Sequence, residues 1–536
     1  AFYGSCLSCL SAVLSFAYPC FGSHMNGRLA AYFLAIAMVA AINVEDPTVV
    51  VSLPDLLGPP VPPGSLFAGY LNISGRHYYY VFARAQENPD TSPFLFWTNG
   101  GPGCSSVGEG LWMEHGPYQV SNKHAGIEPN PFAWNKFANV LYLEHPIGVG
   151  FSYSETPSDY AGLDDFKEAD ELYASLLAFA ERYPHFAPNK EHGMYLSGES
   201  YGGEYVPHLA HRIMFGQSPL LKDALRGIAI GNPALNCEAD RSGYSATLQY
   251  QLYFHHGLMS YHQFRKWSDN GCDRVGQALS APCQRILQEA QDAVGTVNQQ
   301  LKRRRRQHRS AVSSNGGASN SVEANFDPDH KYQSFCHANS TLEFASQHNA
   351  DTQACHPLGD PGRMATYLNR RDVQAALNVR SEKIAAPGGY WTDCAADVAD
   401  GPNGWINYTS SAVNVLRTYI APILAVKQPS EFRMLIFSGD EDIGTCPAPI
   451  TMACLSDLET KVRRISAWKP WTHNGITAGY YEVFDYYVYA TVKGAGHTVP
   501  QYQPLTTFQL LSRWLLNASL VDHLQQRPEA NPIRLV

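Results

Sequence analysis

A serine between two glycines constrains this chain more than any other feature. Ser200 lies in the pentapeptide Gly198-Glu199-Ser200-Tyr201-Gly202, directly after the strand-like run Met194–Ser197 and before a helical pattern that begins at Glu204. A strand that turns sharply into a helix needs small residues two places on either side of the turn residue, because the backbones come close there. The turn exposes the serine hydroxyl at the N-terminus of the helix. The segment therefore predicts a nucleophilic serine on a sheet flanked by helices.

Strand-like runs and helical patterns alternate along the chain. The region Asp164–Tyr183 shows apolar residues at helical spacing, and we expect these residues to face the core: Phe166, Leu172, Leu176, Leu177 and Phe179. Runs rich in β-branched and aromatic residues predict strands at Tyr78–Ala83, Phe94–Thr98, Val140–Leu143, Met194–Ser197, Gly227–Ile230, Met434–Ser438 and Tyr487–Val492. The alternation predicts an α/β fold with a mainly parallel central sheet.

The composition is that of a globular protein. The chain has 536 residues, 45% of them hydrophobic and 16% charged, which excludes a disordered acidic chain or a coiled coil. Its length allows one large domain with insertions or two to three smaller domains. The 39 Lys and Arg against 48 Asp and Glu give a net charge of −9, so we expect no nucleic-acid partner.

Residues 1–41 are excluded from the predicted fold. Arg28 precedes the apolar run 29–41, which is too short to span a bilayer and ends in the small residues Val39-Ala40-Ala41. These features predict a secretory signal peptide that begins at Met25, with a retained anchor as the alternative. The residues before Met25 are interpreted as an upstream segment. After removal of the signal peptide we expect no stable membrane insertion.

Secretion changes the interpretation of the cysteines, because an oxidising compartment favours disulfides. Twelve cysteines are present, and the nine outside residues 1–41 are at positions 104, 237, 272, 283, 336, 355, 394, 446 and 454. Nine is an odd number, so at least one of them is not in an intrachain disulfide. None of the nine belongs to a C-x-x-C pair that would predict a zinc site. Four sequons predict N-glycosylation, at Asn72, Asn339, Asn407 and Asn517. The expected location is the secretory pathway, ending in a vacuole, a lysosome or the extracellular space.

The middle of the chain predicts an insertion. From 237 to 385 the pattern is polar and helical, so the α/β core is predicted to comprise residues 42–236 and 386–536, with a mostly helical cap subdomain between them. Within it, the basic segment 302–309 is followed by a Ser/Gly/Asn-rich stretch that cannot bury itself. This predicts a surface loop that is either cleaved during maturation or merely solvated, with a polyanion contact as a third interpretation.

A nucleophilic serine needs a histidine to take its proton and a carboxylate to orient that histidine. In chains with this type of turn, the acid and the histidine follow the serine in that order. Met434–Ser438 is followed by Gly439-Asp440-Glu441-Asp442, where either Asp440 or Asp442 could be the acid. His497 lies in a glycine-rich loop after the run that ends at Val492, and is the predicted base.

A third glycine-rich segment follows the run that begins at Phe94. Its sequence WTNGGPGCSS, Trp97–Ser106, can direct backbone N–H groups to a developing oxyanion. Together with GESYGG, SGDED and GAGHTVP in the same order, it resembles the serine carboxypeptidase family of the α/β-hydrolases. The segments Leu66–Tyr70, Glu144–Tyr153 and Tyr367–Gln374 resemble further blocks of that family, so that the likeness runs from about residue 47 to the end.

The resemblance implies a role for each matched residue. Ser200 would be the nucleophile, His497 the base and acid, and Asp442 the orienting carboxylate. Gly101 and Tyr201 would supply the N–H groups of the oxyanion hole. A site for the carboxylate of a peptide C-terminus would consist of Asn99, Glu114, Glu199 and Trp97. The resemblance also implies a disulfide between Cys104 and Cys394, no metal or organic cofactor, and peptide or protein C-termini as substrates, and it leaves a homodimer open.

The expected activity is removal of C-terminal residues through an acyl-enzyme. Two neighbouring carboxylates in a dry site share a proton, and the protonated member can donate to a substrate carboxylate, which favours work at acidic pH. Two alternatives come from the same resemblance. One is acyl transfer, and Glu199 beside the nucleophile argues against it. The other is a non-catalytic role as a protective partner of other hydrolases, which the complete triad disfavours.

Overall fold

The computed structural model of the chain describes residues 48–121, 126–238, 243–273, 279–294, 361–395, 398, 414–473 and 476–516. The predicted signal peptide, the basic segment 302–309 and the sequons at Asn339, Asn407 and Asn517 lie outside these residues. Asn72 lies in a strand with its side chain exposed, and its glycosylation stays a prediction. Within the described ranges, none of the helices combines the length and the apolar character that crossing a bilayer requires.

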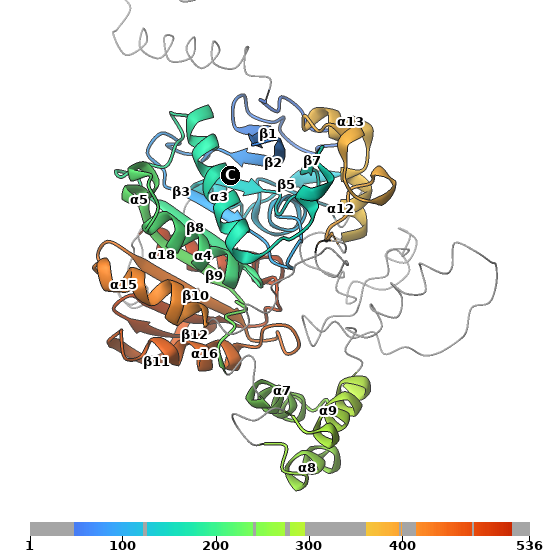
Figure 1. Cartoon of the computed structure of the whole chain (residues 1–536), viewed down its shortest axis with the longest axis vertical. Coiled ribbons are helices and arrows are strands. Elements are labelled where there is room, and N and C mark those ends of the chain that lie inside the picture. The colour runs from blue at the N-terminus through green and yellow to red at the C-terminus, as the bar shows by residue number, and fades with distance from the viewer. Residues whose placement is uncertain are drawn as a thin grey trace, which may run out of the picture.

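An 11-stranded mixed sheet forms the centre of the molecule (Figure 1). Its order is β1-β2-β6-β3-β8-β9-β10-β13-β12-β11, with the short β7 paired to β2. The strands in it are β1 Leu66–Ile73, β2 Arg76–Ala83, β3 Phe94–Thr98, β6 Asn139–Leu143, β7 Tyr153–Ser154, β8 Met194–Glu199, β9 Leu225–Gly231, β10 Arg433–Gly439, β11 Arg464–His473, β12 Ile476–Phe484 and β13 Tyr487–Val492. All seven predicted strands are present. A separate pair consists of β4 Tyr118–Val120 and β5 Ile127–Pro129.

The middle of the sheet is parallel. Strands β6, β3, β8, β9, β10 and β13 pair with one another in parallel, and the antiparallel pairs lie toward the two ends. These central strands are almost continuously apolar because both faces of the sheet are covered. Alternate residues enter two different cores: Leu196 and Ile436 face one, while Tyr195 and Leu435 face the other. The α/β-hydrolase architecture predicted from the sequence is confirmed.

Helices cover the two faces. On one face pack α3 Asp165–Arg182, α4 Gly202–Met214, α5 Pro219–Ala224, α15 Ala421–Val426 and α16 Ala448–Leu455. On the other pack η1 Val107–His115, α12 Pro361–Leu368, α13 Arg371–Ala376, α17 Val499–Tyr502 and α18 Pro504–Leu515. Short turns of helix are η2 Trp134–Lys136, η3 Pro157–Tyr160, η4 Ser381–Lys383, η5 Pro387–Gly389, η6 Leu416–Ile420 and η7 Ser456–Leu458.

Helix α3 matches the predicted amphipathic segment with one exception. Asp164 caps its N-terminus by accepting hydrogen bonds from the N–H groups of Phe166 and Lys167. Leu172, Leu176 and Phe179 are buried as expected. Phe166 is 51% exposed, so its assignment to the core was wrong. The buried residues of the first turn are Asp165, Glu168 and Ala169, so Phe166 lies off the buried face and packs edge-on against a histidine of α4 instead.

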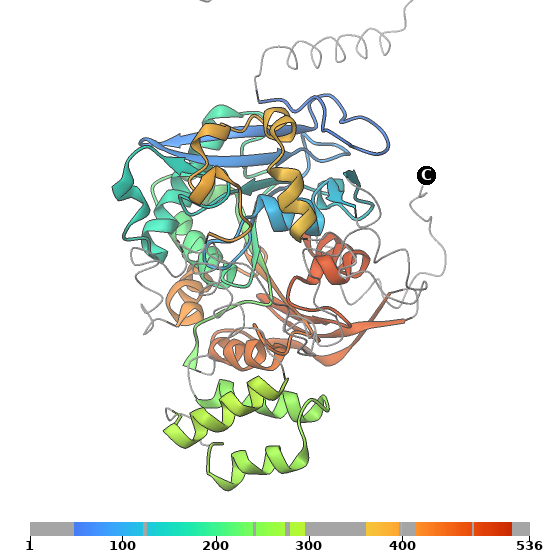
Figure 2. The ribbon, with the colours of Figure 1, turned by 90° about the vertical axis from the view of Figure 1, so that its right-hand side faces the viewer.

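The described part of the predicted insertion lies in two places. Helices α7 Gly243–His255, α8 Tyr261–Asp269 and α9 Ala281–Val294 share a small core of their own and lie apart from the sheet in both views (Figure 1, Figure 2). Ile443, which follows Asp442, packs into that core. Helices α12 and α13 instead pack against the central sheet, in the core that contains Tyr195 and Leu435. The boundaries 237 and 385 stay a prediction.

Three disulfides are present among the described residues, and they pair Cys104 with Cys394, Cys237 with Cys454, and Cys272 with Cys283. The pairing of Cys104 with Cys394 that the family resemblance implied is confirmed. Cys336 and Cys355 lie outside the described residues, and Cys446 is not in any of the three bonds. Disulfides of this kind persist in the oxidising compartments of the secretory pathway.

We predict that the three disulfides do not stabilise the fold equally. Cys237 and Cys454 are 217 residues apart, whereas Cys272 and Cys283 are 11 apart. Loop-closure entropy makes the longer link worth about 2–3 kcal/mol more. The double variant C237A/C454A should therefore lose more free energy of unfolding than C272A/C283A in urea denaturation followed by tryptophan fluorescence. Equal losses in the two variants would contradict the prediction.

Candidate active site

Ser200 occupies the turn between β8 and α4. Its φ is +58°, a left-handed conformation that costs a non-glycine residue about 1–2 kcal/mol. The turn is held because the Ser200 N–H donates to the carbonyl of Gly231, and the Ser200 carbonyl accepts from Gly203 and Ala234. A Cβ at Gly203 would lie 2.2 Å from the Ala234 carbonyl oxygen, so glycine is required there. The strained turn predicted for a nucleophile is therefore present.

The acid and the histidine come from the loops after β10 and β13. Because β8, β9, β10 and β13 run in parallel, their carboxyl ends meet at one edge of the sheet. His497 Nδ1 lies 2.7 Å from Asp442 Oδ2, and both side chains are buried. With Nδ1–H donated to a carboxylate, Nε2 is left as the nitrogen that can accept a proton.

The local pattern left the choice between Asp440 and Asp442 open. Their contacts favour Asp442 as the acid, and this assignment stays a proposal. Asp440 is exposed, and its Oδ1 accepts a hydrogen bond from the Gly494 N–H, which joins the two loops. Asp442 accepts from the N–H groups of Thr445 and Cys446 as well as from His497. The carboxylate of Asp442 is thus fixed in the orientation that the imidazole needs, while Asp440 forms the turn.

Asn232, which sequence reasoning missed, completes the environment of Asp442. It directly follows β9, is fully buried, and has φ +38°. Its Nδ2 donates to Asp442 Oδ2 at 2.8 Å, and its Oδ1 accepts from the Gly439 N–H at 2.9 Å. The left-handed backbone favours asparagine. The signal available in the sequence was Asn-Pro after a strand, but nothing local pointed toward Asp442.

The glycine-rich loop after β3 passes very close to the serine turn. A Cβ on Gly100 would lie 2.4 Å from the Tyr201 backbone nitrogen and 2.7 Å from the Ser200 Cβ, so only glycine fits. Gly101 follows with φ +111°. Tyr201 is the N-cap of α4, and its hydroxyl donates to Asp165 at 2.9 Å. The segments expected to form an oxyanion hole are therefore adjacent, and the assignment of Gly101 and Tyr201 stays a proposal.

The side-chain amide of Asn99 is held in one orientation. Trp97 Nε1 donates to its Oδ1 at 2.6 Å, and the Gly110 N–H donates to the same oxygen at 3.1 Å. Trp97 is fully buried and packs against the rings of His115 and Trp134. It therefore acts on the site through Asn99. With Oδ1 occupied by two donors, Nδ2 is directed toward the acidic residues.

Two predicted glutamates meet at Asn99 Nδ2. Glu114 Oε1 lies 2.8 Å and Glu199 Oε1 2.9 Å from it, and both residues are buried. Burial raises the pKa of Glu114 to about 7. Burial and the nearby carboxylates of Glu114 and Glu109 raise the pKa of Glu199 well above its usual range. The other oxygen of each, Oε2, is buried without a hydrogen-bond partner in the described part of the chain.

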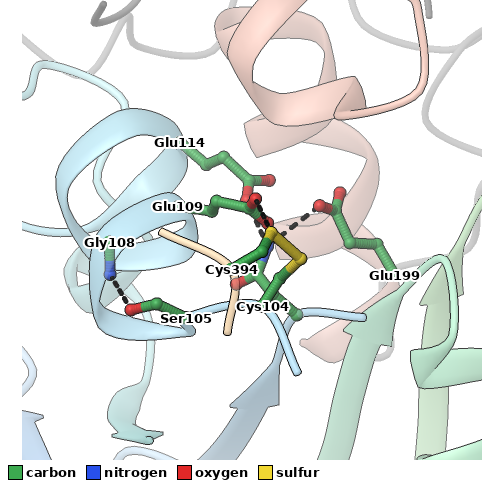
Figure 3. Close-up of a disulfide and its surroundings, with 8 residues drawn as sticks. Cys104, Ser105, Gly108, Glu109, Glu114, Glu199 and Cys394 are labelled. Atoms are coloured by element: carbon green, nitrogen blue, oxygen red, sulfur yellow. Dashed lines mark hydrogen bonds between the residues drawn. A yellow bond between two sulfur atoms is a disulfide. The ribbon is translucent and has the colours of Figure 1, made fainter. Parts of the chain in front are cut away.

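A third glutamate, which sequence reasoning missed, joins this pair. Glu109 Oε2 lies 2.9 Å from the same Asn99 nitrogen, and Figure 3 shows the three carboxylates directed toward one another above a disulfide. One oxygen of each lies within 4.8 Å of the others. Glu109 and Glu114 belong to η1, a π-helix in which hydrogen bonds join residues five apart. Residues i and i+5 therefore lie about one turn apart on the same face, which an α-helix would not allow.

The disulfide Cys104–Cys394 connects the glycine-rich loop to a distant segment beneath these carboxylates (Figure 3). Cys394 Sγ is 3.9 Å from Glu109 Oε1. Oδ1 of the neighbouring Asp393 is buried and receives no hydrogen bond from the described residues. The carboxyl group of Asp393 interacts with that of Glu109. Burial raises the pKa of Asp393 to about 6. The site thus has a second pair of acidic groups on the side of the disulfide.

The arrangement combines a serine on a strained turn, a buried His–Asp pair and a cluster of carboxyls whose pKa values burial raises. The family model for serine carboxypeptidases matches residues 54–517. Serine carboxypeptidase-like 32 from Arabidopsis thaliana is 32% identical over 460 residues, covering 84% of this chain and 88% of that protein. Serine carboxypeptidase-like 34 from the same plant is also 32% identical, covering 85% and 86%. The chain belongs to the serine carboxypeptidase family.

A solved structure supports the same fold. The prohormone-processing carboxypeptidase Kex1(Δ)p from Saccharomyces cerevisiae aligns with a TM-score of 0.60, covering 87% of this chain and 94% of its own. At 17% identity the likeness concerns the fold alone.

We predict that Asn232 positions the catalytic acid. N232A removes a buried donor to Asp442, so kcat should fall about tenfold with little change in KM. The free energy of unfolding should fall by about 1–3 kcal/mol, because a buried acceptor loses its hydrogen bond. The matched control is N378A, since Asn378 also has a left-handed φ of +56° and donates to a backbone carbonyl, at 3.1 Å to Ala68. Steady-state kinetics of both variants on one ester substrate decide the question. If N378A lowers kcat as much as N232A, the positioning role is wrong.

Proposed function

We propose that the chain is a serine-type carboxypeptidase that removes C-terminal residues from peptides and works best at acidic pH. The observation that carries this proposal is the buried pair Glu114 and Glu199 around Asn99, next to Ser200. A cluster of carboxyls is an unusual place to bind an anion. It becomes suitable when burial keeps part of it protonated, because a protonated carboxyl donates a hydrogen bond to a substrate carboxylate.

The proposed reaction follows acyl-enzyme chemistry. Ser200 Oγ attacks the last peptide carbonyl carbon while His497 takes its proton, and N–H groups of the glycine-rich loop and of Tyr201 stabilise the oxyanion. The C–N bond then breaks as His497 returns the proton to the leaving amino acid. Water attacks the acyl-enzyme with His497 again as base, which releases the shortened peptide and restores Ser200. Asp442 orients the imidazole throughout and stabilises its charged form.

The location of the terminal carboxylate restricts which bond is cut. Because Glu199 directly precedes Ser200 in the chain, a carboxylate held by Asn99 and the protonated glutamates would lie near the nucleophile, which favours attack on the last peptide bond. An endopeptidase would need an open path at this point, and an esterase would need no carboxylate site. The family relatives are named serine carboxypeptidase-like, and acyl transfer by the same triad is the alternative that the following experiment separates.

We predict that an N-blocked dipeptide acid is hydrolysed in preference to its C-terminal amide, with a KM that is lowest at acidic pH. The protonated pair binds the acid, so KM should rise as the pH passes through the Glu114 pKa of about 7, by at most about tenfold per pH unit. The measurement is steady-state hydrolysis of the acid, the amide and the ester from pH 4.5 to 7.5, with S200A as the inactive control. A KM for the acid that stays flat across this range contradicts the proposed recognition. Hydrolysis of the ester alone would favour acyl transfer.

We also predict that E114Q flattens this pH profile. The amide that replaces the carboxyl in this variant cannot ionise, so one of the two shared-proton groups is removed. KM for the dipeptide acid should then vary less than about 1.5-fold from pH 5.5 to 7.5, a range over which a group with a pKa of about 7 gives a rise of about fourfold. Hydrolysis of the ester, which presents no carboxylate to this pair, should change less with pH in this comparison than hydrolysis of the acid. A profile as steep as that of the wild type would show that the titrating group lies elsewhere.

A further inference from the structure

Three carboxylates compete for one nitrogen in this site. Asn99 Nδ2 has Glu109 Oε2 at 2.9 Å, Glu114 Oε1 at 2.8 Å and Glu199 Oε1 at 2.9 Å. An amide NH₂ group carries two hydrogens, so it can satisfy two acceptors well and not three. The amide cannot relieve the conflict by turning over, because Trp97 and the Gly110 N–H donate to its other end.

Glu109 is more exposed than the other two glutamates. Glu114 and Glu199 are 2% exposed, whereas Glu109 is half-buried and lies in the first turn of η1. Its second oxygen faces the disulfide, 3.9 Å from Cys394 Sγ, and its carboxyl interacts with Asp393. Figure 3 shows it between Glu114 and the disulfide. Glu109 can therefore move away from Asn99 at a smaller cost than the two buried glutamates.

The contact that Glu109 makes is the one that a substrate would need. A peptide C-terminus presents a carboxylate, and the proposed function directs it to Asn99 and the protonated pair. We propose that Glu109 is an internal competitor for this site: in the free enzyme its carboxylate occupies a donor of Asn99, and the terminal carboxylate of the substrate must displace it. This inference rests on the proposed function, because it uses the same carboxylate site.

The proposal makes Glu109 a determinant of substrate specificity. A substrate carboxylate needs the Asn99 N–H group from which Glu109 accepts, so Glu109 weakens the binding of every ligand that ends in a carboxylate. A ligand that ends in a neutral amide has no carboxylate to place on Asn99 and is not subject to this competition. Glu109 thus lowers the preference for peptide acids over peptide amides, which Glu114 and Glu199 raise.

Binding without turnover tests the proposal. Isothermal titration calorimetry at pH 6 compares S200A, S200A/E109Q and S200A/E109A with an N-blocked dipeptide acid and its C-terminal amide. Removal of Glu109 should lower Kd for the acid about tenfold in both double variants and leave Kd for the amide within about twofold. The control S200A/E87Q removes an exposed glutamate in the loop after β2 and should change neither value. Thermal denaturation of each protein establishes that the variants are folded.

Two results would overturn the proposal. An unchanged Kd for the acid would show that Glu109 does not compete, and an increased Kd would show that it helps to bind the carboxylate. Failure of the proposed function looks different. In that case the wild-type enzyme does not hydrolyse the dipeptide acid, while the calorimetric comparison still reports whether Glu109 opposes its binding to S200A.

Discussion

The parallel pairing of β3, β8, β9, β10 and β13 is the constraint on which the rest of this structure depends. Backbone hydrogen bonds between these strands bring their carboxyl ends to a single edge of the sheet. Ser200, Asn232, Asp442 and His497 each follow one of these strands, although most of them are far apart in sequence. Because both faces of the sheet are covered by apolar side chains, the strands are rigid, and short loops can hold polar groups in fixed orientations.

Burial gives the same edge its unusual electrostatics. Glutamates removed from water hold their protons at higher pH, and here burial acts on Glu114 and Glu199 together with the charges around them. The amide of Asn99 contacts both carboxyls, and Trp97 holds that amide in place from inside the core. The packing of Trp97 therefore affects the two carboxyls, because it orients the amide that contacts them. A fully buried tryptophan decides which atoms of Asn99 face the acidic residues.

Much of the fold followed from local patterns. The continuous apolar strands, the capped and amphipathic α3 and the turn at Ser200 are all encoded within short windows, so their prediction required only periodicity and the glycines around the serine. Phe166 shows the limit of that approach. Other residues of the first turn of α3, such as Asp165 and Glu168, are buried, so Phe166 lies off the buried face, and only the packed structure reveals its exposure.

The sequence by itself determined the class of fold, the serine turn, the histidine loop and the order of the motifs, because each depends on residues that are neighbours in the chain. Tertiary structure placed Asp442, and not Asp440, against His497, brought Asn232 to Asp442 and placed Glu109 beside Glu114 and Glu199. These contacts depend on the path of loops from different strands and on the five-residue spacing of a π-helix. Neither is visible in a sequence window, since both follow from how distant segments pack together.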